Sequence, residues 1–149
     1  MGERDTPEQL KARALRHLVR REHSRAELAR KLAAHAASRE DLEALLASLV
    51  ATKRLCDARY AEERARTLSR KYGAAKIRHD LNAKGVSAGI VDAVSSAGEL
   101  ERARAILERK YRLPAATREE RAKRARFLQG RGFSSDVVLR LVLDREDAS

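Results

Sequence analysis

Aromatic residues, proline and cysteine are all scarce in this chain of 149 residues, which has no tryptophan and a single cysteine, Cys56. One cysteine excludes an intramolecular disulfide and cannot build a zinc cluster. The four histidines show no HExxH or similar spacing of metal ligands, and no glycine-rich phosphate loop occurs. We therefore expect no catalytic residue, no cofactor, no metal and no enzymatic activity.

Long apolar runs are also missing. No run approaches the ~20 residues that a membrane-spanning helix needs. The first residues, Met-Gly-Glu-Arg-Asp-Thr-Pro, contain no apolar segment of the kind found in signal peptides. The sequence predicts a cytoplasmic protein without membrane contact.

The apolar content is aliphatic and favours helices. Hydrophobic residues make up 43% of the chain, and alanine, leucine and valine supply most of them. Alanine and leucine have good helix propensity, and runs of β-branched residues are few. Because a buried alanine contributes little apolar area, we expect small helical modules with thin local cores.

The chain repeats itself with a period near 48 residues. Short similar stretches begin at Leu32, Leu81 and Leu128, at spacings of 49 and 47 residues. Ten residues beyond each of these leucines stands the first member of an apolar pair spaced three apart. The pairs are Leu42/Leu45, Val91/Val94 and Val138/Leu141. The third copy has about eight extra residues around Leu113-Pro114, which predict a loop.

Each repeat reads as three helices. Ser24-x-x-Glu27 and Thr117-x-x-Glu120 fit a capping box at the start of the second helix. Gly85 and Gly132 stand where a left-handed residue would end that helix. The third helix is expected to begin near Ser38, Ser87 and Ser134.

The sequence therefore predicts an all-α protein of three tandem three-helix, helix-turn-helix-like repeats that stack into an elongated curved array. The expected boundaries are a flexible N-terminus at 1–9, repeats at 10–53, 54–97 and 98–143, and a C-terminal tail at 144–149. The alternative is one helical bundle with coincidental self-similarity.

The net charge of +11 predicts a polyanionic partner, such as nucleic acid or an acidic protein surface. The basic excess is spread over the chain: residues 1–55, 56–98 and 99–149 carry excesses of four, three and four.

Arg16 and Arg20, like Arg66 and Arg70, lie one helical turn apart, where like charges destabilise an isolated helix slightly. A charge pattern repeated at that cost suggests a binding surface, and the alternative is an ordinary solvated face. The candidate binding residues are Arg16, Arg20, Arg66, Arg70, Lys71, Lys76, Arg78, Lys84, Arg121, Lys123, Arg124, Arg126 and Arg131.

The five aromatic residues favour a core role over a stacking platform for bases. Tyr60, Tyr72, Tyr111, Phe127 and Phe133 are interpreted as the large core residues of their repeats. Contacts to phosphates or carboxylates should then outweigh base contacts, and sequence specificity should be poor.

The segment from Leu55 to Val94 resembles the central motif of the RecX family. The matching residues are Asp57, Arg59, Tyr60, Ala61, Arg70, Gly73, Ile77, Leu81, Lys84, Gly85 and Ile90. The first repeat, with Ser24, Glu27-Leu28 and Lys31-Leu32, resembles the family's N-terminal repeat, and the likeness extends from about Leu10 to Leu143. Cys56 departs from the acidic residue that is frequent there, and Tyr60 replaces a common phenylalanine.

The resemblance implies a regulator of DNA recombination, DNA repair and the SOS response. Such a protein lies along the groove of a RecA–DNA filament and inhibits filament growth, ATP turnover and strand exchange. The implied partners are the RecA filament and, without sequence specificity, single-stranded and double-stranded DNA; we expect a monomer. Two alternatives stay open: a stand-alone, non-sequence-specific DNA-binding protein, and a helical scaffold for peptides.

Overall fold

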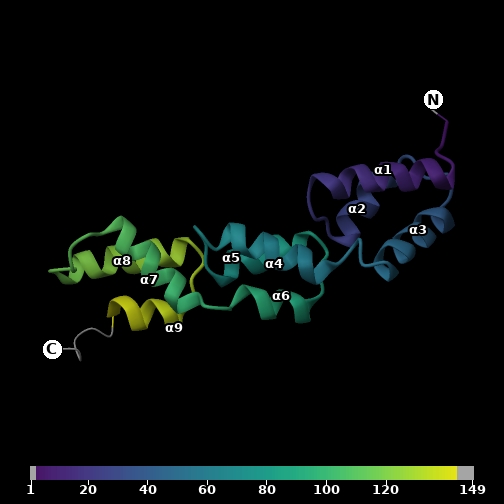
Figure 1. Cartoon of the computed structure of the whole chain (residues 1–149). Coiled ribbons are helices and arrows are strands. Elements are labelled where there is room, and N and C mark those ends of the chain that lie inside the picture. Colours follow the sequence, from purple (N-terminus) through teal and green to yellow (C-terminus); the bar gives the residue numbers. More distant parts are fainter. Residues whose placement is uncertain (1–2, 144–149) are drawn as a thin grey trace. The chain divides into compact units, whose positions relative to one another are not determined.

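The computed structural model describes residues 3–143, and all the regular structure in that range is helical (Figure 1). The elements are α1 (Pro7–Arg20), α2 (Arg25–Leu32), α3 (Arg39–Ala51), α4 (Asp57–Leu68), α5 (Ala74–Ala83), α6 (Ala88–Ser95), α7 (Glu99–Lys110), α8 (Arg118–Gly130), α9 (Ser135–Val138) and a π-type turn, η1 (Leu139–Leu143). The predicted all-α fold is confirmed. The predicted tail at 144–149 lies outside the described residues.

The chain divides into two compact units. Unit 1 comprises residues 1–63 and 81–90, and unit 2 comprises residues 64–80 and 91–149. Helices α4, α5 and α6 each have residues in both units. The predicted repeat boundaries stay a prediction, but α1 begins at Pro7, before the expected start at residue 10, with Thr6 as its N-cap.

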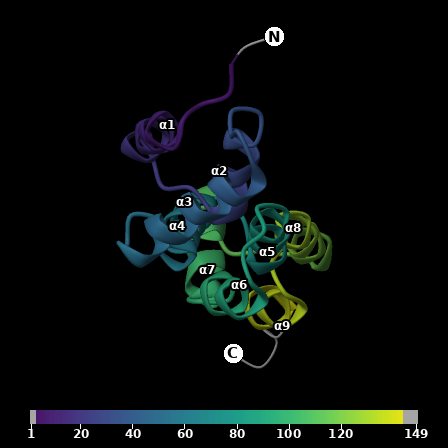
Figure 2. The same ribbon diagram turned by 90° about the vertical axis from the view of Figure 1, so that its right-hand side faces the viewer.

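Unit 1 has a core made almost entirely of leucine and alanine. Helices α1, α2 and α3 each pack against the other two (Figures 1 and 2). The buried residues of this cluster are Leu10, Ala14, Leu28, Leu32, Ala36, Leu42, Leu46, Leu49 and Leu55. The small alanines allow short helices to pack closely, as the composition predicts.

Unit 2 has a separate core. Helix α9 and η1 contact both α7 and α8. The buried residues here are Ala103, Ile106, Ala125, Leu128, Phe133, Val137, Val138 and Val142. The predicted loop of the third repeat is also present: the chain between α7 and α8 is not helical, and Leu113 on it is 77% exposed.

Side-chain caps mark four helix starts at the predicted residues. The hydroxyl oxygens that accept a backbone N–H three residues further on belong to Ser24, Ser38, Thr117 and Ser134. The two predicted capping boxes are only half formed, because Glu27 binds Arg21 and Glu120 accepts from the N–H of Ala116. The complete box lies at Thr6 and Gln9, where we did not expect a helix start.

Gly85 and Gly132 have φ values of +78° and +91°, which confirms the predicted left-handed helix ends. In the described part of the chain, no helix is long and apolar enough to cross a membrane.

Candidate binding surface

The predicted basic residues lie on four helices and on the turns that follow them. Arg16 and Arg20 are exposed on α1, and Arg66 is exposed on α4. Arg70 and Lys71 follow α4, Lys76 and Arg78 lie on α5, and Lys84 follows α5. Arg121, Lys123, Arg124 and Arg126 lie on α8, and Arg131 is its C-cap.

In unit 1, ion pairs within the fold engage part of a first basic cluster, which consists of Lys11, Arg13, Arg16, Arg20 and Arg21. Arg13 binds the Asp5 carboxylate through two nitrogens, at 2.8 and 3.3 Å. Arg21 binds Glu27 in the same bidentate way, at 3.0 and 2.7 Å. Asp5 and Glu27 lie only eight and six residues from their partners, so the interpretation of this cluster as free of acidic neighbours is wrong for Arg13 and Arg21.

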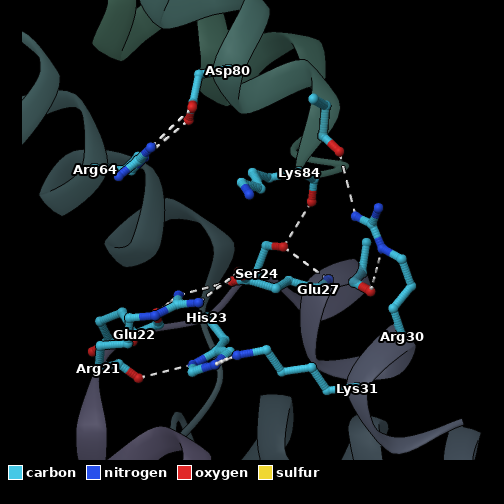
Figure 3. Close-up of polar contacts among 12 residues, drawn as sticks. Arg21, Glu22, His23, Ser24, Glu27, Arg30, Lys31, Arg64, Asp80 and Lys84 are labelled. Carbon is cyan, nitrogen blue, oxygen red and sulfur yellow. Dashed lines mark hydrogen bonds and ion pairs between the residues drawn. The ribbon is translucent and has the colours of Figure 1, made fainter. Parts of the chain in front are cut away.

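Carboxylates also neutralise part of a second basic cluster, which consists of Arg64, Arg66, Arg70, Lys71, Lys76 and Arg78. Within unit 2, Arg64 makes two hydrogen bonds of 3.0 Å to Asp80 (Figure 3). Arg78 lies 3.4 Å from Asp92. Among residues 3–143, no carboxylate pairs with Arg66, Arg70, Lys71 or Lys76, and all four side chains are exposed. These four cations are available to a partner.

Two arginines of a third basic cluster contact aromatic rings. This cluster consists of Arg121, Lys123, Arg124, Arg126 and Arg131. The Arg124 guanidinium lies 4.4 Å from the ring centre of Tyr111, and that of Arg131 lies 5.1 Å from Phe127 and 5.9 Å from Tyr72. These cation–π contacts hold the guanidinium groups in place while leaving most of their donors unused.

The predicted core role of the aromatic residues is only partly correct. Tyr60 and Phe133 are buried, but Tyr72, Tyr111 and Phe127 are half-exposed. The difference arises because the thin core of unit 2 is filled by alanine, leucine and valine, and these rings lie at its edge beside cations.

One turn in each unit carries a predicted basic residue and is fixed by a helix N-terminus. In unit 1, the Ser24 hydroxyl donates to the Lys84 carbonyl oxygen at 2.7 Å (Figure 3). In unit 2, the Gly73 N–H donates to the Arg131 carbonyl oxygen at 2.8 Å. Ser24 and Gly73 are separated by the repeat period of 49 residues, and Lys84 and Arg131 by 47. The two turns are equivalent.

Beside each of these two contacts, a carboxylate accepts a hydrogen bond from the next backbone N–H of the same helix N-terminus. Asp57, at the start of α4, accepts from the N–H of Arg25 at 2.7 Å, and Glu99, at the start of α7, accepts from the N–H of Ala74 at 2.9 Å. Each acid satisfies an N-terminal amide that has no partner in its own helix. Sequence reasoning named Asp57 as a residue of the family motif but not its bridging role, and it missed Glu99, because an acid in the first turn of a helix normally reads as a partner of its own helix dipole.

A buried histidine supports the Ser24 end of the first contact. His23 Nδ1 must carry the proton, because it donates at 3.0 Å to the Arg21 carbonyl, and Nε2 then accepts from Lys31 at 2.9 Å (Figure 3). Burial lowers the pKa of His23; the hydrogen bond to the Arg21 carbonyl opposes this, and the charges of Arg21 and Lys31 lower the pKa further. A neutral imidazole thus orients Lys31.

Glu27 carries a charge in the same region. Burial alone would raise the pKa of its carboxyl, but the hydrogen bonds and charge of Arg21 outweigh burial and lower the pKa to about 2. No group of three or more potential metal ligands occurs among the described residues. The arrangement offers exposed cations on a fixed scaffold, which suits binding of a polyanion.

Two family models match the part of the chain that contains α4 to α9. A family model described as "RecX, third three-helix domain" matches residues 97–142, and one described as "RecX, second three-helix domain" matches residues 57–94. The chain is 47% identical over 132 residues to the "Regulatory protein RecX" of Leptothrix cholodnii, covering 87% of this chain and 84% of the relative. It is 47% identical over 150 residues to the protein of the same name from Herbaspirillum seropedicae, covering 96% and 97%.

Solved structures show a similar fold. The crystal structure of RecX from Lactobacillus salivarius superposes with a TM-score of 0.79 at 20% identity, covering 96% of this chain and 97% of that one. A second structure, titled "Crystal structure of regulatory protein RecX", gives a TM-score of 0.72 at 24% identity and covers 93% and 73%.

Proposed function

Because the chain belongs to the RecX family of regulatory proteins, we propose that it binds a RecA–DNA filament and inhibits its growth, ATP turnover and strand exchange. The role is that of a regulator of recombination, DNA repair and the SOS response in the cytoplasm, not of a catalyst. Its direct partners are the recombinase and the DNA of the filament, bound without sequence specificity.

The observation that carries this proposal is the set of exposed cations without carboxylate partners among residues 3–143: Arg66, Arg70, Lys71 and Lys76. The Arg70 carbonyl accepts from the Arg109 side chain at 3.0 Å, which fixes the backbone beneath this cluster. Cations held on a fixed backbone lose less conformational entropy on binding than cations on a mobile tail.

Lys84 and Arg131 extend the binding surface to equivalent turns. Each carbonyl accepts a hydrogen bond from the residue that precedes a helix, from the Ser24 hydroxyl in unit 1 and from the Gly73 N–H in unit 2, so the two turns occupy matched positions of the repeat. A filament is itself a repeating polyanion. Several weak matched contacts then act together through effective concentration.

The experiment measures DNA-dependent ATP turnover of a RecA-type recombinase as this protein is titrated in below equal stoichiometry. The test variant combines Arg66→Glu, Arg70→Glu and Lys71→Glu. The control combines Arg39→Glu, Arg54→Glu and Arg118→Glu, three exposed arginines outside the proposed surface. We expect the test variant to lose inhibition at an unchanged melting temperature while the control retains it. Inhibition kept by the test variant would exclude this surface.

The alternative function is stand-alone DNA binding by the helix-turn-helix-like modules. A pull-down at moderate salt separates the two, because a filament regulator needs recombinase on the strand and a DNA-binding protein does not. If about six phosphates of naked DNA are bound, affinity should fall ~10³-fold between about 50 and 200 mM salt. A shallow salt dependence, with binding only to coated strands, supports the filament regulator.

A further inference from the structure

Unit 2 contains a cavity of about 730 Å³, and Arg66, Arg70, Lys71 and Lys76 are not among its lining residues. It is formed by α7, α8, η1 and the connection between α7 and α8, drawn in green in Figure 1. That connection is the insertion of the third repeat. Tyr111, Arg112, Leu113, Pro114 and Ala115 all come from it, so the other repeats have no counterpart.

The lining of the cavity is strongly cationic. It contains five arginines against one acid, Glu108. The arginines are Arg104, Arg112, Arg121, Arg124 and Arg140. Within the described chain, Arg112 and Arg140 are exposed and have no carboxylate partner, whereas Arg104 lies 3.3 Å from Glu101. Guanidinium groups gathered in this way suit an oxyanion that accepts paired hydrogen bonds.

An aromatic and apolar wall stands beside these cations. Tyr111 is half-exposed, with Arg124 at 4.4 Å from its ring centre and Phe127 against it edge-on at 6.2 Å between centroids. Arg124 also donates to the Leu113 carbonyl at 2.8 Å, which fixes the insertion beside the ring. Leu113 is 77% exposed, so its apolar side chain is accessible to a ligand in the cavity.

We propose that this cavity binds one nucleotide of a single-stranded nucleic acid, with the phosphodiester on Arg112 and Arg140 and the base stacked on Tyr111 beside Leu113. Arginines alone would suit any phosphate or carboxylate. The aromatic ring and the exposed leucine favour a single-stranded nucleic acid as the ligand, because an unpaired base presents a flat face for stacking and a duplex does not. The inference rests on the proposed function and deepens it, because it names a site for the DNA strand and the kind of strand that is bound. This contact is measured on a bare strand at low salt, whereas the pull-down at moderate salt measures the binding that depends on recombinase.

The test uses fluorescence anisotropy of the full-length protein with a labelled oligothymidylate of about 12 nucleotides at about 50 mM salt, without recombinase. We expect the single strand to bind at least about tenfold more tightly than a duplex of equal length. The variant Arg112→Ala/Arg140→Ala should bind the strand at least about tenfold more weakly. The control Arg39→Ala/Arg118→Ala, two exposed arginines outside the cavity, should change affinity less than about twofold.

The base contact is tested with an abasic strand of the same length. Wild type should bind it at least about fivefold more weakly than oligothymidylate. Tyr111→Leu should remove that difference, and Tyr111→Phe should keep it. Equal melting temperatures of the two variants separate stacking from a loss of folding.

Three results would overturn the proposal: equal affinity of wild type for the abasic and the base-containing strand, equal affinity for strand and duplex, or unchanged binding by the arginine variant. Displacement of the strand by hexaglutamate at equal charge would also overturn it and indicate an acidic-peptide site. Inhibition of recombinase ATP turnover is measured on the same samples. Its persistence when strand binding fails removes the cavity proposal and leaves the filament regulator intact.

Discussion

The Glu99 carboxylate accepts a hydrogen bond of 2.9 Å from the backbone N–H of Ala74, 25 residues earlier in the chain. It also accepts from the N–H and the hydroxyl of Ser134, at 3.1 and 2.8 Å. One buried acid thus satisfies the first turn of α5 and the N-cap of α9 together. Asp57 does the same for the first residue of α2 in unit 1.

Glu99→Ala should lower the free energy of unfolding by about 3 kcal/mol, because it leaves donors of Ala74 and Ser134 without a partner in a buried site. Urea unfolding followed by far-ultraviolet circular dichroism measures this loss. The control is Glu119→Ala, an exposed acid in the first turn of α8, which should change stability by less than about 0.5 kcal/mol. Similar losses in both variants would contradict the bridging role of Glu99.

Gly73→Ala should cost about 2 to 3 kcal/mol of stability, because a Cβ there would lie 2.5 Å from the backbone N and Cα of Phe133. Backbone atoms cannot move aside as the end of a side chain can. Gly89→Ala is the matched control: its Cβ would meet nothing within 4 Å. Gly89 lies in α6, so alanine should stabilise it by about 0.5 to 1 kcal/mol. The prediction fails if the two variants melt at the same temperature.

Stability should decrease as the pH falls below the ordinary histidine value of about 6.5. Burial lowers the pKa of His23 and of His17, so the unfolded chain binds more protons than the folded chain in this window. His17→Gln/His23→Gln should flatten the dependence. Denaturant titrations at stepped pH provide the measurement.

A second loss should follow at lower pH. The pKa of Glu27 is lowered to about 2 from an ordinary value of 4.5, so its contribution is complete above about pH 4.5 and is lost as the pH falls toward 2. Glu27→Gln should therefore cost about 1 to 2 kcal/mol at neutral pH, allowing for solvent screening of the exposed Arg21. Glu40→Gln, an exposed acid on α3, serves as the control. Parallel pH profiles for wild type and Glu27→Gln would refute this assignment.

Local features of this fold were predictable, because each depends on one residue type. Gly85 and Gly132 mark left-handed positions that other residues rarely adopt, and Ser38 and Ser134 cap helices through their own hydroxyls. The insertion at Leu113 was visible as extra length between similar segments. Such signals lie within a few residues of the feature that they predict.

Contacts between side chains of different elements were not predictable in this way. Arg78 looks free of acids until α6 places Asp92 beside it, and Arg13 looks free until the first residues place Asp5 there. The cavity was missed because its arginines come from elements far apart in sequence, and because Tyr111 was assigned to the core. Which of the predicted cations bind a partner depends on these pairings, and a periodic pattern contains no information about them.

The segment before α1 makes a backbone hydrogen bond of the same kind as the one that joins Gly73 to Arg131. The Asp5 N–H donates at 2.8 Å to the carbonyl of His35, which lies one repeat period before Lys84, and Arg4 donates to the neighbouring carbonyl of Ala34. Arg13 anchors Asp5 in that position. The carbonyl of this turn therefore has a backbone donor from the segment before α1. A chain of this design can be lengthened by inserting a module between existing ones, where helix start, turn and acid all recur.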